Sequence, residues 1–238
     1  ERGGFDVLEA PLDDGWDLDV AALKRLVDAH APNVIFLASP NNPTSNVYSE
    51  GRIVDVLELA TSSFVVVDEA YGDFAGESLR RLRERFPHLG ILRTLSKVGL
   101  AALRVGWLEA DEALVRELDK GRQPFNVSAT SQAAATAVLR EAWSDVQHRV
   151  REVVRERERL AAEVRALGGG VTPSRANFLW VHTPRPAVDV YNDLARRGVL
   201  VRHYGGGERL AHQLRITVGS PAENDRLVSA LRAASLGG

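Results

Sequence analysis

The sequence contains no cysteine and no methionine in 238 residues. Without cysteine the chain can form neither disulfide bonds nor thiolate metal sites, and a reducing compartment is compatible with this composition. The six histidines never recur at a spacing of four, which two metal ligands on one helix face would need. The composition therefore predicts no metal site.

Excess charge and long apolar runs are also lacking. The formal net charge is −2, which does not favour nucleic acid or an anionic membrane surface as a partner. The arginine-rich run "HRVREVVRERER" is interleaved with glutamate and is typical of a solvated helix face. No apolar run approaches the roughly 18 residues of a membrane-spanning helix. We expect a cytoplasmic protein without nucleic-acid or membrane partners.

Lysine is scarce, since only Lys24, Lys97 and Lys120 stand among 30 basic residues. Lys24 falls on the polar face of a predicted helix, and Lys120 ends another, where a cation is favoured by the helix dipole. Lys97 instead lies in the mostly apolar run "ILRTLSKVGLAALRVGWL". An amine can lose a proton and attack a carbonyl, whereas a guanidinium group effectively cannot. Lys97 is therefore a candidate for Schiff-base chemistry.

The first half of the chain alternates between short apolar runs and amphipathic segments. Apolar spacing predicts a helix in "DLDVAALKRLVDAH", capped by Asp17 or Asp19 and ended by Pro32. Continuous apolar strands between helices are typical of a parallel sheet that is covered on both faces. The predicted strands are 33–38, 63–67, 90–96 and 103–108, and the further helices are 49–61 and 111–120.

The second half has a different pattern. A continuous helical stretch is predicted from about Ser128 to Leu167, followed by a small α+β unit. That unit comprises "ANFLWVHT", a helix over 186–197, "GVLVRHY", "QLRITVG" and a helix over 221–235. We expect a sheet domain over 1–125, a linking helix over 126–150 and a small domain over 151–238.

Polar side chains follow three successive predicted strands. They are Asn41 and Asn42, then Asp68, Glu69 and Tyr71, then Thr94, Ser96 and Lys97. Each group has an ordinary structural explanation when taken alone, as a turn, a helix cap or a surface pair. Ligands of open α/β sheets bind outside the carboxyl ends of the strands, so the three groups together favour a binding site.

The carbonyl that Lys97 attacks could belong to a substrate or to pyridoxal phosphate. Asp68 favours the cofactor, because a carboxylate can hold the proton on the pyridine nitrogen. Burial and a nearby cation such as Arg104 would favour the neutral amine. Asn42 and Tyr71 could donate to the phenolic oxygen of the ring. Ser96 and Arg104 could bind its phosphate.

Seven motifs together resemble one enzyme family. They are "SPNNPT" (39–44), "VVVDEAYGDF" (65–74), "RTLSKVGLAALRVGW" (93–107), "PFNVS" (124–128), "ANF" (176–178), "GVLVR" (198–202) and "LRITVG" (214–219). In order and spacing they resemble the class I/II pyridoxal-phosphate aminotransferases of fold type I, and within these the histidinol-phosphate aminotransferases. The resemblance covers nearly the whole chain and implies an α/β fold with a small α+β C-terminal domain.

The resemblance also implies roles for single residues and partners. Lys97 would bind the cofactor covalently, Asp68 would pair with the pyridine nitrogen, and Arg215 would grip the donor's carboxylate or phosphate. Arg202 matches a position that helps to recognise a substrate phosphate. The implied reaction joins L-histidinol phosphate to 2-oxoglutarate, and the implied assembly is a homodimer.

The chain departs from the family pattern in the turn after the first strand and at its front. Ser45 stands where relatives usually have glycine, and we expect a negative φ there. "ERGGFDVLEAPLDDGWDLD" reads like the middle of a protein rather than a targeting segment. The resemblance implies roughly a hundred further residues before Glu1, without which part of the sheet would be uncovered.

Two alternatives remain open at this point. The first keeps the fold and cofactor with another substrate, as in an aromatic or other amino-acid transaminase or an amino-acid-phosphate decarboxylase. The second is an inactive fragment or a ligand-sensing domain. The intact set of Lys97, Asp68 and Arg104 favours an enzyme over the second alternative.

Overall fold

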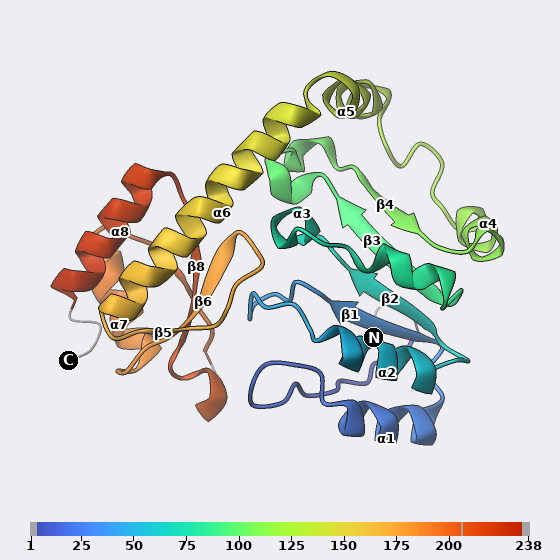
Figure 1. The fold of residues 1–238 in the computed structure, drawn as a ribbon, viewed down its shortest axis with the longest axis horizontal. Helices are drawn as coiled ribbons and strands as arrows, with labels where there is room; N and C mark the ends of the chain where they lie inside the picture. Colours follow the sequence, from blue (N-terminus) through green and yellow to red (C-terminus); the bar gives the residue numbers. More distant parts are fainter. Residues whose placement is uncertain (1–3, 206, 235–238) are drawn as a thin grey trace.

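The computed structural model describes residues 4–205 and 207–234. The described residues form two four-stranded sheets, one from β1 to β4 and the other from β5 to β8. Figure 1 shows the two sheets side by side, with the long helix α6 (Trp143–Ala166) running diagonally from one toward the other.

The first sheet has the order β1-β2-β3-β4. β1 (Val34–Ala38), β2 (Phe64–Asp68) and β3 (Leu89–Thr94) are parallel, which confirms the predicted mainly parallel sheet. β4 (Gly106–Glu109) pairs antiparallel with β3. The connection over residues 95–105 is too short for a parallel crossover, which needs a dozen or more residues.

Two predicted helices cover one face of this sheet. α1 (Val20–His30) is capped by Asp19, whose Oδ1 accepts a hydrogen bond from the Ala22 amide at 2.9 Å. α2 (Glu50–Leu59) follows β1. Figure 1 shows α2 in front of the strands. The buried strand residues beneath are Ile35, Leu37, Val65, Val67, Leu89 and Ile91.

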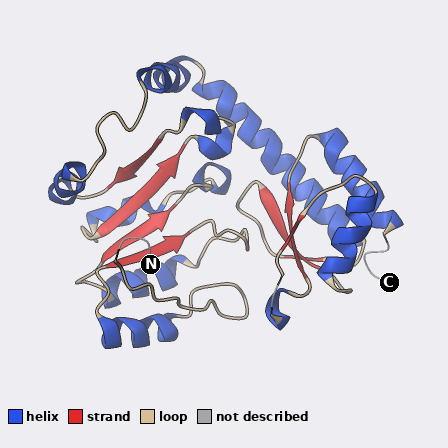
Figure 2. Ribbon diagram, turned by 180° about the vertical axis from the view of Figure 1, so that it is seen from behind, coloured by secondary structure: helices blue, strands red, loops and turns tan. Residues whose placement is uncertain are grey.

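The opposite face of this sheet is partly open. Side chains alternate along β1, where Ile35 and Leu37 are 9% and 4% exposed but Val34 and Phe36 are 45% and 69% exposed. Figure 2 shows this side, with the strands in front of the helices. The prediction of a sheet covered on both faces is wrong for the described residues.

The predicted continuous helix is broken into two. α4 (Glu112–Lys120) agrees with the prediction, but α5 (Ala129–Glu141) ends before Ala142, whose φ of −127° is not helical. α6 then begins at Trp143. No glycine or proline marks this break in the sequence. After the break α5 contacts both α6 and the turn over Ala101–Leu103, and such tertiary contacts leave no mark in the local periodicity.

The second sheet is antiparallel, in the order β5-β6-β8-β7. Its strands are β5 (Gly170–Val171), β6 (Phe178–His182), β7 (Arg202–His203) and β8 (Gln213–Thr217). β5 was not predicted, because two residues carry no periodic signal. Domain boundaries near residues 125 and 150 stay a prediction.

Three helices bury one face of the second sheet. α6, α7 (Ala187–Arg196) and α8 (Pro221–Ala233) pack on Leu179 and Val181 of β6 and on Leu214 and Ile216 of β8. Alternation therefore turns Phe178, Trp180 and His182 of β6, and Gln213, Arg215 and Thr217 of β8, to the opposite face.

A small cluster joins the two sheets. Tyr71 and Phe74, at α3 (Gly72–Ala75), pack with Ala176 and Phe178 against the valines of α6. Arg157 of α6 is 3% exposed. It donates from its NH1 atom to the carbonyl oxygens of Phe74 at 3.2 Å and Ala176 at 3.1 Å. A buried cation thus ties α6 to both halves of the chain.

Two features are absent from residues 4–205 and 207–234. None of the helices there is both long and apolar enough to cross a membrane. The same residues contain no group of three or more metal-binding side chains.

Candidate functional site

Lys97 lies in a short 3-10 turn, η2 (Ser96–Val98), just beyond the end of β3. Its Nζ atom is 5.2 Å from the centre of the Tyr71 ring. The side chain is exposed. The turn projects past the strand end, where the Tyr71 ring contacts the amine and water still reaches it.

Asp68 is the last residue of β2, paired in register with Ala38 of β1 and Leu92 of β3. It is half-buried, and its Oδ1 accepts a hydrogen bond from the Ala70 amide at 2.9 Å. Its Oδ2 has no hydrogen bond to any described residue. One carboxylate oxygen is thus held by the backbone while the other remains available to a ligand.

Aromatic rings connect Tyr71 to the second sheet. The ring of Tyr71 meets that of Phe178 edge to face, with centres 5.1 Å apart. The guanidinium carbon of Arg215 lies 5.0 Å from the centre of the Phe178 ring. A cation over an aromatic face and an edge-to-face ring pair are both favourable arrangements. The four side chains from Lys97 to Arg215 therefore form one continuous path.

Asn42 completes this path from the turn after β1. The NH1 atom of Arg215 donates to Asn42 Oδ1 at 2.7 Å. Because the oxygen is engaged, Asn42 can present its Nδ2 amide hydrogens to another acceptor. Five side chains therefore follow one another in space, in the order Lys97, Tyr71, Phe178, Arg215 and Asn42. All of them except Phe178 were predicted as site residues from the sequence.

Ser96 begins the 3-10 turn η2, and Arg104 directly follows the next 3-10 turn, η3 (Ala101–Leu103). Ser96 Oγ is 2.9 Å from Thr94 Oγ1. Arg104 has a left-handed φ of 56°, and its side chain is exposed. Its NH1 makes one long contact, at 3.5 Å, with the carbonyl of Ala101. The Ser96 hydroxyl and the Arg104 guanidinium group, which both have donors to spare, are thus close to Lys97 in the sequence.

Arg202 and Arg215 are directly opposite each other across β7 and β8. Opposed residues of neighbouring strands project from the same face of a sheet, and two like charges there are unfavourable unless an anion lies between them. The Arg202 guanidinium also lies 5.6 Å from the centre of the Tyr204 ring. This pair of arginines is suited to an anionic group.

Part of the predicted convergence does not occur. Glu69 is 2% exposed and turns to the face opposite Asp68, as expected for successive residues of an extended strand. It accepts hydrogen bonds from Ser78 Oγ and the Leu79 amide, both at 2.7 Å, and pairs with Arg93. Asn41 is also buried and bonds to Thr44. Glu69 and Asn41 thus stabilise the loops that follow β2 and β1 through hydrogen bonds within the protein.

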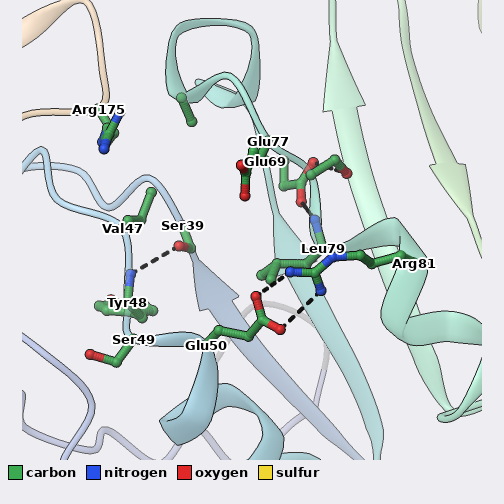
Figure 3. A pocket seen from close by; sticks show the side chains of 12 residues that line it. Ser39, Val47, Tyr48, Ser49, Glu50, Glu69, Glu77, Leu79, Arg81 and Arg175 are labelled. Carbon is green, nitrogen blue, oxygen red and sulfur yellow. Dashed lines mark hydrogen bonds and ion pairs between the residues drawn. The ribbon is translucent and has the colours of Figure 1, made fainter.

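A cavity of about 420 Å³ lies on that same side, shown in Figure 3. Ser39, Tyr48 and Glu69 line it, and the ion pair of Glu50 with Arg81 closes one side. Burial, and then the charge of Asp17, raise the pKa of the Tyr48 phenol. None of the eight predicted site residues is among the residues that line this cavity.

Two aromatic residues of β6 were not singled out by the sequence reasoning. Phe178 and Trp180 were noted only as members of the segment "ANFLWVHT". Trp180 meets Trp16 at 5.8 Å and Tyr204 at 5.5 Å, edge to face in both cases. The alternation in "FLWVH" could have found them, because it places Phe178, Trp180 and His182 on one face of β6.

Ser45 corrects one expectation about the turn after β1. Its φ is +63°, in the left-handed region, rather than negative. The side chain is fully buried, and its Oγ has no hydrogen-bond partner among the described residues. The carbonyl of Ser45 accepts from the Arg175 amide at 2.7 Å, which holds the turn against the second half of the chain.

Comparison with known proteins identifies the family. The family model described as aminotransferase class I and II matches residues 1–231. The chain belongs to this family. The resemblance inferred from the seven motifs is thereby confirmed.

Curated relatives in the family are similar along nearly the whole chain. A histidinol-phosphate aminotransferase of Aquifex aeolicus is 39% identical over 229 residues, which are 96% of this chain and 64% of the relative. One from Thermococcus gammatolerans is 41% identical, over 96% of this chain and 63% of the relative. The chain thus spans a little under two thirds of the length of these family members.

Solved structures of the family share the fold. A histidinol-phosphate aminotransferase of Sinorhizobium meliloti, in complex with pyridoxal-5'-phosphate, is 26% identical, with a TM-score of 0.85 over 97% of this chain and 64% of that one. The enzyme from Clostridium acetobutylicum has a TM-score of 0.88 at 19% identity, over 98% of this chain and 72% of that one. The predicted fold class, an α/β fold of the fold type I transferases, is confirmed.

Proposed function

We propose that the protein is a pyridoxal-phosphate-dependent aminotransferase that acts in histidine biosynthesis, with L-histidinol phosphate as donor and 2-oxoglutarate as acceptor. The family and its similar members, named histidinol-phosphate aminotransferases, support the reaction class. The observation that carries the substrate is the pairing of Arg202 with Arg215 across β7 and β8. Two guanidinium groups on one sheet face suit a phosphate better than an uncharged side chain.

The donor set fits the cofactor. Asp68 has a carboxylate oxygen available for a protonated pyridine nitrogen, since the Ala70 amide occupies the other. Asn42 retains its amide hydrogens for a phenolic oxygen, because Arg215 occupies its carbonyl oxygen. Ser96 and Arg104 would hold the phosphate, and Lys97 offers an exposed amine to the aldehyde. When bound, pyridoxal phosphate supplies an electron sink for negative charge at the substrate's α-carbon.

The chain's own groups then move and hold protons. With the cofactor bound, Lys97 Nζ would be the base that takes the proton from the substrate's α-carbon. Asp68 would hold the proton on the pyridine nitrogen. The Tyr71 ring, 5.2 Å from Nζ and 9% exposed, limits where the amine can go. Arg215 and Arg202 orient the anionic ends of the donor and the acceptor.

Two further parts of the proposal concern the protein as a whole. By resemblance to the family we assign a homodimer and a cytoplasmic location. Sedimentation of the purified chain tests the first, and a dimer would agree with the exposed apolar residues Val115 and Leu118 of α4.

The lysines allow a matched test of the chemistry. Lys97→Arg keeps the positive charge near Tyr71 but removes the nucleophile. Lys24→Arg and Lys120→Arg are controls, because both lysines form exposed ion pairs, with Asp28 and Glu117. After borohydride treatment with pyridoxal phosphate, we expect a covalent adduct in both controls and none in Lys97→Arg. An adduct retained in Lys97→Arg would refute the assignment of this residue.

The substrate is tested by comparing donors. Histidinol phosphate should give a higher kcat/KM than phenylalanine, and Arg202→Gln should raise the KM for histidinol phosphate by about tenfold or more. The same variant should leave the KM for phenylalanine nearly unchanged. Preference for phenylalanine would favour an aromatic transaminase, and carbon dioxide release would favour a decarboxylase. Cofactor binding without conversion of any donor would favour a ligand-sensing domain.

A further inference from the structure

A second cavity, of about 220 Å³, lies where α6 meets the segment that enters β6. It is separate from the path between Lys97 and Arg215, and none of the eight predicted site residues lines it. Its volume is well above the space that a single buried water needs. The charged residues that line it are Arg157, Glu158, Arg165 and Arg175.

Three residues of α6 form one wall of this cavity. Arg157, Ala161 and Arg165 follow each other at intervals of four and so lie on one face of the helix. Ala161 is 3% exposed and small, which leaves a notch between the two arginine side chains. The segment from Pro173 to Arg175 forms the opposite wall.

The charge in the cavity is strongly positive, although the chain as a whole carries −2. Three guanidinium groups and one carboxylate, that of Glu158, line it. Arg157 is itself 3% exposed and is therefore poorly hydrated. Arg165 and Arg175 are exposed, so Arg157 alone gains from the stronger attraction that a cation withheld from water exerts on an anion.

Two of these arginines have donors to spare. Arg165 makes one long hydrogen bond, 3.3 Å from NH2 to the carbonyl of Val171. The side chain of Arg175 forms no hydrogen bond or ion pair with any described residue, although its amide donates to Ser45. Arg157 is occupied by two carbonyls and by Glu158, so it contributes charge rather than free donors.

We propose that this cavity binds a phosphate group, as inorganic phosphate or as a phosphate monoester, at a site apart from the cofactor and the substrate. The planar forks of Arg165 and Arg175 match phosphate oxygens in pairs, which favours phosphate over a halide or a single carboxylate. Arg157 supplies a fixed charge at the base. The alanine notch at position 161 provides the room.

The test is calorimetric titration of the whole chain with inorganic phosphate, at constant ionic strength maintained with chloride. Arg165→Gln and Arg175→Gln should each weaken phosphate binding by about tenfold. Arg151→Gln, on an exposed part of α6 away from the cavity, is the matched control and should bind as the parent chain does.

Glu158→Gln provides an opposite expectation. It removes the one carboxylate in the lining but keeps an acceptor for Arg157, so phosphate should bind several-fold more tightly. Repeating the titration with glycerol phosphate distinguishes the two ligand sources, since a monoester site binds it more tightly than inorganic phosphate does. The proposal is overturned if Arg165→Gln and Arg175→Gln bind phosphate as tightly as the parent chain does, or if phosphate binds no better than chloride.

Discussion

Arg215 of β8 donates a hydrogen bond to Asn42, 173 residues away in sequence, at 2.7 Å. This contact links the turn after β1 to the second sheet. It engages the amide oxygen of Asn42, so the amide hydrogens on Nδ2 are the atoms that Asn42 presents to a ligand. A predicted substrate ligand and a predicted cofactor ligand therefore act on each other directly, and a change at one is expected to alter the other.

The first prediction tests that coupling with Asn42→Asp. A carboxylate still accepts from Arg215, so the melting temperature should not fall. It no longer donates to the phenolic oxygen and repels negative charge there, so pyridoxal phosphate should bind at least about tenfold more weakly. Spectrophotometric titration measures the affinity. Arg215→Gln is the comparison, with the larger loss of stability and the smaller loss of cofactor affinity. Equal cofactor affinity in Asn42→Asp and the parent chain would contradict this account.

The second prediction concerns Ser45, whose left-handed φ of +63° and partnerless buried hydroxyl are both unfavourable. Ser45→Gly removes both and should raise the free energy of unfolding by about 1 kcal/mol, after allowing for the entropy of glycine. Ser45→Ala removes the hydroxyl alone and should be stabilised less. Urea denaturation measures both variants. If Ser45→Ala proves the more stable of the two, backbone strain is not the dominant effect.

The third prediction concerns the buried guanidinium group of Arg157. Arg157→Met keeps much of the volume but leaves the carbonyls of Phe74 and Ala176 without their donor. The free energy of unfolding should fall by about 2–4 kcal/mol, since each carbonyl stranded away from water costs roughly 1–3 kcal/mol. Arg151→Gln, an exposed change on the same helix, should stay within about 0.5 kcal/mol. A loss in Arg157→Met no larger than in this control would show that the buried arginine does not tie α6 to the two halves.

The fourth prediction concerns pH. Hydrogen bonds from Arg159 and then Asn224 hold the pKa of Glu156 below its usual range. Glu156 therefore binds a proton more readily in the unfolded chain. The free energy of unfolding consequently rises with pH between the lowered, folded-state pKa and the ordinary carboxyl pKa. The contribution is fully present above the ordinary carboxyl pKa and is lost as pH falls through the lower, folded value.

Glu156→Gln should be less stable than the parent chain at neutral pH and should lose less stability on acidification. Denaturant midpoints measured from pH 7 down to about pH 3 check this, since the ordinary carboxyl pKa is near 4.3. Glu152→Gln, at an exposed position of α6, is the control and should keep the parent profile. Identical pH profiles for Glu156→Gln and the parent would exclude a role for this carboxyl in acid sensitivity.

Local pattern was enough to predict most elements of the fold. Apolar spacing located α1, and the cap at Asp19 is one of the two that the sequence offered. Continuous apolar runs located β1, β2 and β3 to within two residues, because strands buried in a parallel sheet need no polar face. The scarcity of lysine singled out Lys97, and the motifs around it identified the family.

Contacts between distant residues decided the rest. The break at Ala142 accompanies contacts of α5 with α6 and with the turn over Ala101–Leu103, and nothing in the local sequence marks it. The exposure of Lys97, the turning of Glu69 away from Asp68, and the opposition of Arg202 to Arg215 all depend on strand register and on which face each element covers. The sequence by itself determined which residues have the chemistry for the site. Only the tertiary structure decided which of them meet, because register and packing are set by the whole chain and not by any one segment.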